Sequence, residues 1–83
     1  MNENFIFEPK LNFNYEVYLN DNKTLLFLQF LEEKNHNEYK FYECIEIQTN
    51  KRYIFYSNKK GEYIIETMTI FGDILKYTIY YIL

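Results

Sequence analysis

The sequence predicts an all-β fold, an up-and-down antiparallel meander of about seven strands that forms a small barrel or a twisted sheet. Apolar and polar residues alternate with a period of two along most of the chain, as in strands with one buried face. Polar clusters interrupt the alternation about every 8–14 residues, a spacing typical of hairpin turns and too short for crossover helices. The chain also holds 10 Tyr and 8 Phe but no Ala, the strongest helix former.

The predicted strands belong to a single domain, residues 1–83, because a chain of this length encloses only one small core. They span residues 4–8, 11–19, 24–32, 38–48, 51–57, 62–71 and 74–82. The turns between them are rich in Asn, Asp and Gly, which adopt tight-turn backbone conformations. The second and last strands have the clearest apolar parity, formed by Leu11, Phe13, Tyr15, Val17 and Leu19 and by Leu75, Tyr77, Ile79, Tyr81 and Leu83.

Two segments have a less regular pattern. Residues 24–34 are apolar on both parities, which fits either a central strand or a short helix capped by Asp21 or Thr24. We expect the strand, because the flanking residues resemble hairpin turns. In residues 38–48, Glu43 interrupts the apolar parity, as at an edge, a bulge or a polar interior site. That parity consists of Tyr39, Phe41, Ile45 and Ile47.

The opposite faces of the later strands are apolar as well. Their residues are Ile54 and Tyr56, then Ile64, Met68 and Ile70, then Ile74, Tyr80 and Ile82. A contiguous exposed patch of this kind usually marks an interface. A meander also leaves two open edges, which proteins remove by closing a barrel or by pairing the edge with another subunit. We therefore expect a protein partner or a homodimer.

The composition excludes several classes of protein. A net charge of −3 argues against a binder of duplex DNA or of membrane surfaces, which needs a basic face. A single cysteine, Cys44, excludes an internal disulfide framework. Without a signal-peptide pattern or an apolar run long enough to span a membrane, we expect a cytoplasmic protein. The many Asn, Lys, Ile, Tyr and Phe residues have A/T-rich codons and indicate a low-GC bacterium, its phage or another virus.

No pattern in the sequence supports an enzyme, a metal site or a cofactor. His36 is the only histidine, and a transition-metal site needs several ligands at defined spacing. Cys44 lies close to Glu43 and Glu46 in the sequence, and carboxylates raise a thiol pKa instead of activating the nucleophile. Glu43 and Glu46 have opposite strand parity, so they cannot form a catalytic carboxylate pair. We therefore predict no catalytic residues, no metal and no cofactor.

The segment 51–60 is locally basic. It holds four of the nine bases and no acid, so the remaining residues carry five bases and 12 acids, a net charge of −7. Cations beside aromatic residues are typical of surfaces that bind single-stranded nucleic acid. We favour a solvated hairpin, because the rest of the chain is so acidic. The candidate binding surface consists of Arg52, Tyr53, Tyr56, Lys59 and Lys60 with Tyr80 from the last strand.

The leading functional hypothesis is a small acidic protein-binding module, an inhibitor or adaptor that docks through a Tyr/Ile-rich sheet face or edge. Tyr is enriched at such surfaces because it provides rigid amphipathic contact area. A phage- or virus-encoded protein acting on a host or defence protein fits the size, acidity and codon usage. One alternative is a small-ligand-binding barrel with an apolar pocket. A second is a single-stranded nucleic-acid binder that uses the hairpin of residues 51–60.

Overall fold

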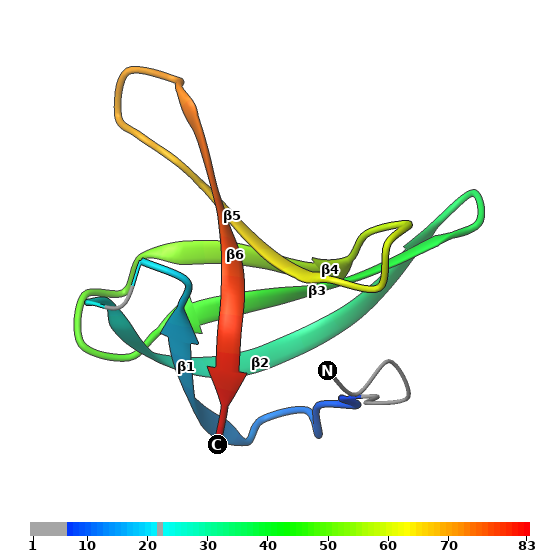
Figure 1. Ribbon diagram of the computed structural model, residues 1–83, viewed down its shortest axis with the longest axis horizontal. Helices are drawn as coiled ribbons and strands as arrows, with labels where there is room; N and C mark the ends of the chain where they lie inside the picture. The colour runs from blue at the N-terminus through cyan, green and yellow to red at the C-terminus, as the bar shows by residue number, and fades with distance from the viewer. Residues whose placement is uncertain (1–6, 22) are drawn as a thin grey trace.

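The computed structural model describes residues 7–21 and 23–83, which form one antiparallel sheet closed into a six-stranded barrel (Figure 1). Each strand pairs with its neighbours in the sequence, and β1 pairs with β6 to close the ring, with Val17 opposite Ile82. Consecutive pairing follows from the short turns, which allow only hairpin connections. The strands are β1 (Asn14–Leu19), β2 (Leu25–His36), β3 (Tyr39–Glu46), β4 (Arg52–Ser57), β5 (Tyr63–Met68) and β6 (Ile74–Ile82).

The predicted all-β meander is confirmed, with six strands instead of seven. Most of the strand predicted at residues 4–8 lies outside the described residues, and residues 7–8 belong to no strand. Residues 24–34 form most of β2, so the alternative of a short helix there is wrong. β2 pairs with β1 on one side and with β3 on the other, and the residues of its second apolar parity, Leu25, Phe27 and Leu31, are half-buried.

The core consists of side chains that point into the barrel. Phe30 and Phe55 lie at its centre, with their ring centroids 5.1 Å apart and edge to face. Phe7 closes one end, where its ring contacts Phe55 and its backbone N–H donates a hydrogen bond to the Tyr63 hydroxyl. The largest fully buried side chains are Val17, Leu28, Phe30, Cys44, Phe55 and Ile65.

The buried parity of β3 is the reverse of the predicted one. Tyr42, Cys44 and Glu46 point into the barrel, whereas Phe41 and Ile45 are only half-buried on the outer face. Glu43 is also on the outer face, where it forms an ion pair with Lys34 of β2 at 3.1 Å. The irregularity expected at Glu43 lies in the partner strand, as a shift of register between Phe30 and Glu32.

Glu46 is almost fully buried, yet its carboxylate has hydrogen-bond donors for both oxygens. Oε2 accepts a bond from the Phe27 N–H at 3.1 Å, and Oε1 accepts bonds from the Thr49 N–H at 3.1 Å and the Thr49 hydroxyl at 2.9 Å. These contacts tie the β3–β4 turn to β2. A buried carboxylate is tolerated when its oxygens are hydrogen-bonded in this way, which is why a charged residue can take an interior position.

A bulge in β6 changes which of its residues face the core. Leu19 of β1 lies opposite Ile79, but the next pair is Tyr18 with Tyr81, so Tyr80 is the extra residue. After the bulge Ile82 packs against the core, whereas Tyr81 is 52% exposed. The prediction that Tyr81 and Leu83 belong to the buried parity, with Ile82 opposite, is therefore wrong.

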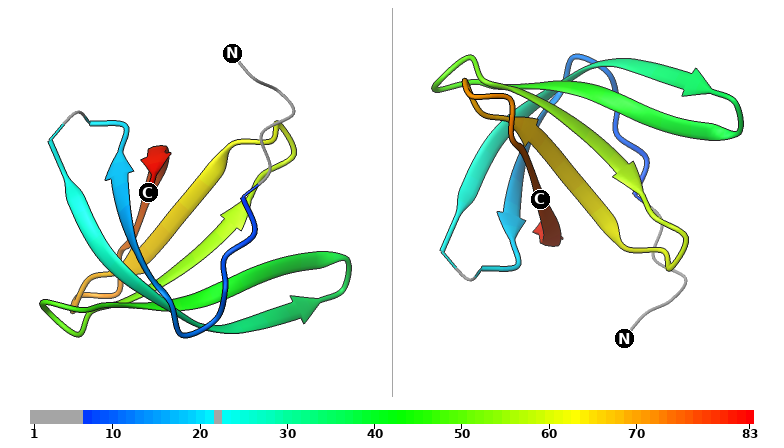
Figure 2. Two further views of the ribbon diagram at one scale, coloured as in Figure 1. Left: turned by 90° about the horizontal axis from the view of Figure 1, so that it is seen from below. Right: turned by 90° about the horizontal axis from the view of Figure 1, so that it is seen from above.

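Two hairpins extend beyond the barrel. The β2–β3 hairpin reaches past the other strands in both views of Figure 2 and carries mainly charged and polar side chains. The β5–β6 hairpin leaves the barrel in a different direction and ends in the loop drawn in orange in Figure 1. The described residues contain no helix that could cross a membrane.

Candidate functional site

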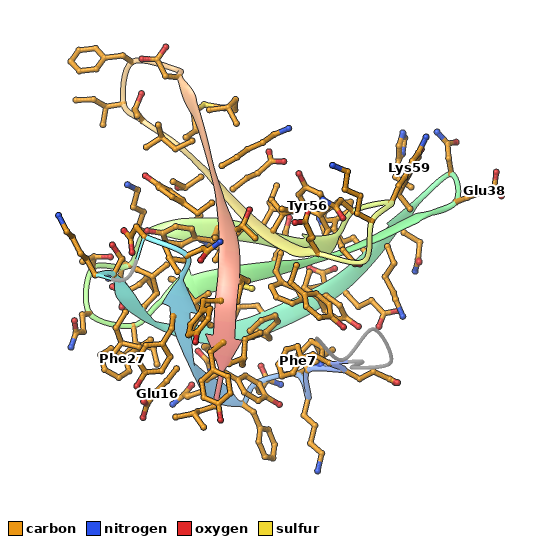
Figure 3. The ribbon with its side chains drawn as sticks, viewed as in Figure 1. Phe7, Glu16, Phe27, Glu38, Tyr56 and Lys59 are labelled. Atoms are coloured by element: carbon orange, nitrogen blue, oxygen red, sulfur yellow. The ribbon has the colours of Figure 1, made fainter. Side chains whose placement is uncertain are left out.

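The outer part of the β5–β6 hairpin, residues 67–75, is the feature that stands apart from the barrel, and we call it the arm. Pairing between β4 and β5 stops at Ile54 opposite Glu66, whereas β5 and β6 stay paired up to Met68 opposite Ile74. The β1–β6 pairing begins only at Ile79. The arm is therefore supported by its own two strands, and the side chains at its end stand clear of the barrel in Figure 3.

The arm exposes four large apolar side chains. Ile70 and Phe71, in the turn, are 94% and 85% exposed, and Met68 and Ile74 are 58% and 52% exposed. Met68 and Ile74 are cross-strand neighbours and share one face. Single exposed apolar residues are common on protein surfaces, but a contiguous group that includes two nearly fully exposed side chains usually marks a contact surface.

The turn at the tip is held in one conformation by hydrogen bonds that converge on Thr69. The Thr69 N–H donates to the Asp73 carbonyl at 2.9 Å, and the Gly72 N–H donates to the Thr69 carbonyl at 3.0 Å. The Thr69 hydroxyl oxygen accepts bonds from the N–H groups of Phe71 and Asp73 at 3.2 and 3.1 Å. Gly72 supplies the positive φ of 89° that the turn requires. Ile70 and Phe71 are thus presented on an ordered support.

A pocket of about 350 Å³ lies at the root of the arm, where β5 separates from β4. The two strands remain linked there by the Thr67 hydroxyl, which donates a hydrogen bond to the Arg52 carbonyl at 2.7 Å. Ile54, at 40% exposure, is accessible beside the pocket. The residues that line it are Glu43, Cys44, Arg52, Tyr53, Ile54, Glu66, Thr67, Met68 and Ile74.

The charges near the root are partly compensated within the chain. Glu66 accepts a hydrogen bond from the Tyr56 hydroxyl and lies 3.9 Å from the Lys76 ammonium. Burial, together with this hydrogen bond, raises the pKa of Tyr56 to about 12. Arg52 at the root and Asp73 at the tip are exposed, so the two ends of the arm present charges of opposite sign.

The structure scatters the residues of the predicted binding surface. Arg52 begins β4 and borders the root pocket, whereas Lys59 and Lys60 lie in the turn at the other end of that strand. Tyr80 is 71% exposed at the β6 bulge. Figure 3 shows Tyr56 and Lys59 on the side of the molecule toward the β2–β3 hairpin.

Tyr53 is only 8% exposed because it shares the parity of the core, although it is one of the residues that line the root pocket. Phe55 is buried as well. The hairpin of residues 51–60 has bases at both ends, but two of its three aromatic rings, Tyr53 and Phe55, are buried, and Tyr56 is the ring that stays partly accessible for stacking on nucleotide bases. The strand alternation explains this, because Tyr53 and Phe55 share the parity of the core.

Packed side chains fill the centre of the barrel, and a second pocket, of about 800 Å³, is lined by Phe7, Tyr42, Phe55 and Tyr63 among others. Cys44 is fully buried, and burial raises the pKa of its thiol to about 12, which is unfavourable for a nucleophile. Among the described residues, no three His, Cys, Asp or Glu side chains are grouped so that they could hold a metal ion.

Sequence reasoning missed Phe71 and underestimated Ile70. The strand predicted at residues 62–71 placed both in regular sheet, with Ile70 on the second apolar face. In the structure β5 ends at Met68, and both residues lie in the turn. The Gly72–Asp73 pair directly after them could have indicated a turn at this position. Two large apolar residues are unexpected in a turn unless another molecule contacts them.

Comparisons with protein-family models, curated protein sequences and solved structures found no match to this chain. The functional argument therefore depends on the arm and its chemistry.

Proposed function

We propose that this chain is a small acidic protein-binding module, an inhibitor or adaptor, that docks by inserting the tip of the arm into an apolar pocket of another protein. The observation that supports this proposal most is the exposure of Ile70 and Phe71, 94% and 85%, on a hydrogen-bonded turn. A barrel that needed only to fold would gain nothing from placing these side chains in water.

The energetics favour a few strong contacts at the tip. Burying an exposed Ile or Phe side chain contributes about 1.5–3 kcal/mol. The Thr69 hydrogen bonds order the turn before binding, so less conformational entropy is lost when the partner is engaged. Large side chains that enter a pocket and exclude water are the usual energetic centre of a protein interface.

The charge of the chain indicates what surrounds the pocket on the partner. Outside residues 51–60 the chain has 12 acids and five bases, and Asp73 is exposed beside the apolar tip. A basic surface on the partner, such as the groove of a nucleic-acid-binding protein, would speed association and favour this orientation. With the A/T-rich codon usage, we propose a phage- or virus-encoded protein that acts on such a host protein.

Site-specific photo-crosslinking in lysate of the native host tests the proposal. The chain carries p-benzoylphenylalanine in place of Phe71, and a control chain carries it in place of Tyr39, which is 62% exposed on the other hairpin. We expect one discrete adduct from position 71 and none of that mass from position 39. Excess unlabelled wild type should abolish the adduct, whereas the I70S/F71S variant should not compete. Equal adducts from both positions, or none from position 71, would contradict the proposal.

A further inference from the structure

Apolar side chains lie at the tip of the arm, on its outer face and at its root. Met68 and Ile74 lie side by side on the outer face, and Ile54 joins them at the root pocket. Ile70 and Phe71 follow in the turn beyond Met68. A projecting apolar tip and an apolar hollow thus lie at opposite ends of one surface.

The hollow has room for the tip. A cavity of about 150 Å³ is enough to hold a benzene ring in a protein. The root pocket measures about 350 Å³, so it can hold the ring of Phe71 with space for part of Ile70. The tip cannot reach the pocket of its own chain, because the paired strands of the arm separate the two.

A two-fold axis would bring each tip to the other molecule's pocket. When two arms lie antiparallel, the surface meets itself, and each contact occurs twice, as in an isologous dimer. Met68 and Ile74, which are half-exposed and line the pocket, would then contact the tip of the other molecule.

The charges at the two ends of the arm match the same arrangement. Asp73 is exposed at the tip, and Arg52 is exposed at the border of the root pocket. An antiparallel pair of arms places Asp73 of each molecule near Arg52 of the other, so each unlike pair forms between molecules. A parallel pair would bring like charges together and is disfavoured.

We infer that in the absence of another partner the arm is covered by a second copy of this chain, in a two-fold dimer with each tip in the other's root pocket. The inference uses the same exposed arm as the proposed function and goes beyond it, since it holds whatever the identity of the other partner. A partner that takes the tip would then displace the second copy.

Sedimentation velocity over a range from micromolar to millimolar concentration tests the dimer. We expect a monomer–dimer equilibrium for the wild type and a dissociation constant raised about 100-fold or more in I70S/F71S. The control variant L11S/F13S changes two exposed apolar residues outside the arm and should shift the constant less than about threefold. A wild type that stays monomeric, or a dimer that I70S/F71S leaves intact, would overturn the inference.

Charge exchange tests the antiparallel arrangement independently of the apolar contacts. D73R and R52D should each weaken the dimer by about fivefold to tenfold, and the double variant R52D/D73R should restore wild-type affinity within about threefold. A double variant no tighter than the weaker single variant would rule out the pairing of Asp73 with Arg52. If the wild type is monomeric but still forms the adduct from position 71, the dimer alone is contradicted. If the wild type dimerises but forms no such adduct, the proposed docking function alone is contradicted.

Discussion

Glu46 shows at the scale of one residue how the interior tolerates a charge. Its carboxylate accepts three hydrogen bonds and joins the end of β3 to β2 and to the β3–β4 turn. Alternation along the strand predicted that Glu46 would face solvent, because pattern alone treats every carboxylate as an outward residue. The donors that stabilise it, the Phe27 N–H and both donors of Thr49, become neighbours only when the chain folds.

The substitution E46A should lower the free energy of unfolding by about 2–3 kcal/mol, because it leaves the Phe27 N–H and the Thr49 donors without their acceptor. Urea denaturation followed by circular dichroism measures the change. The matched control is E32A, an exposed carboxylate in β2, which should change stability by less than about 0.5 kcal/mol. Equal losses for the two variants would contradict the role assigned to Glu46.

Thr69 organises the arm at the scale of an element. Its hydroxyl oxygen accepts hydrogen bonds from two backbone N–H groups of the turn, and its own N–H and carbonyl bond to the Asp73 carbonyl and the Gly72 N–H. Ladder pairing of β5 with β4 ends at Ile54 and Glu66, and the Thr67 hydroxyl links the root of the arm to β4, so the order of the tip depends on these local bonds. The arm should therefore open and close independently of the barrel.

In T69V the amide hydrogens of residues 70–73 should exchange with solvent several times faster, because the one hydroxyl oxygen that accepts two hydrogen bonds of the turn is lost while the side-chain shape is kept. Hydrogen–deuterium exchange measured by mass spectrometry would detect the change. Exchange in β2 and β3 should not change, and the free energy of unfolding should fall by less than about 1 kcal/mol. Faster exchange throughout the barrel would show that the arm is not an independent unit.

The positions of the strands could be predicted from the sequence, but the buried face of β3 and of the end of β6 could not, because it depends on how each strand pairs with its neighbour. The positions of β1, β4 and β6 followed from alternation and turn residues, because a hairpin sets its own register. The buried parity of β3 and the change of parity in β6 did not follow, since both depend on shifts of register in β2–β3 and β1–β6 pairing. In the candidate site, Arg52 and Tyr53 both line the root pocket, whereas Phe71 at the tip was not predicted from the sequence.

Several tyrosines of the barrel make the stability of the whole molecule depend on pH in the alkaline range. Burial raises the pKa of Tyr42 and Tyr53 above 10, and the hydrogen bond to Glu16 raises that of Tyr18. Tyr56 shifts furthest, to about 12. In each case the folded state holds the phenolic proton more tightly than the unfolded chain does.

Ionisation of these tyrosines should therefore leave the free energy of unfolding unchanged below pH 10 and lower it as the pH rises from about 10 to 12. The sign follows because the unfolded chain releases its phenolic protons first. Urea midpoints measured between neutral pH and pH 11 test this. Y56F should be less stable than wild type at neutral pH, and the difference should shrink above pH 10. A difference that grows above pH 10 would contradict this account.

The central claim about the whole molecule is that the tip of the arm is exposed to solvent in the monomer and covered in the complex. Hydroxyl-radical footprinting of Phe71 tests this most directly, with the buried Phe30 and Phe55 as internal references. We predict rapid oxidation of Phe71 in dilute monomer, slow oxidation of both references, and protection of Phe71 when the protein associates with itself or with its partner. Phe71 that is protected in the monomer, or that stays fully reactive in the associated state, would contradict the account.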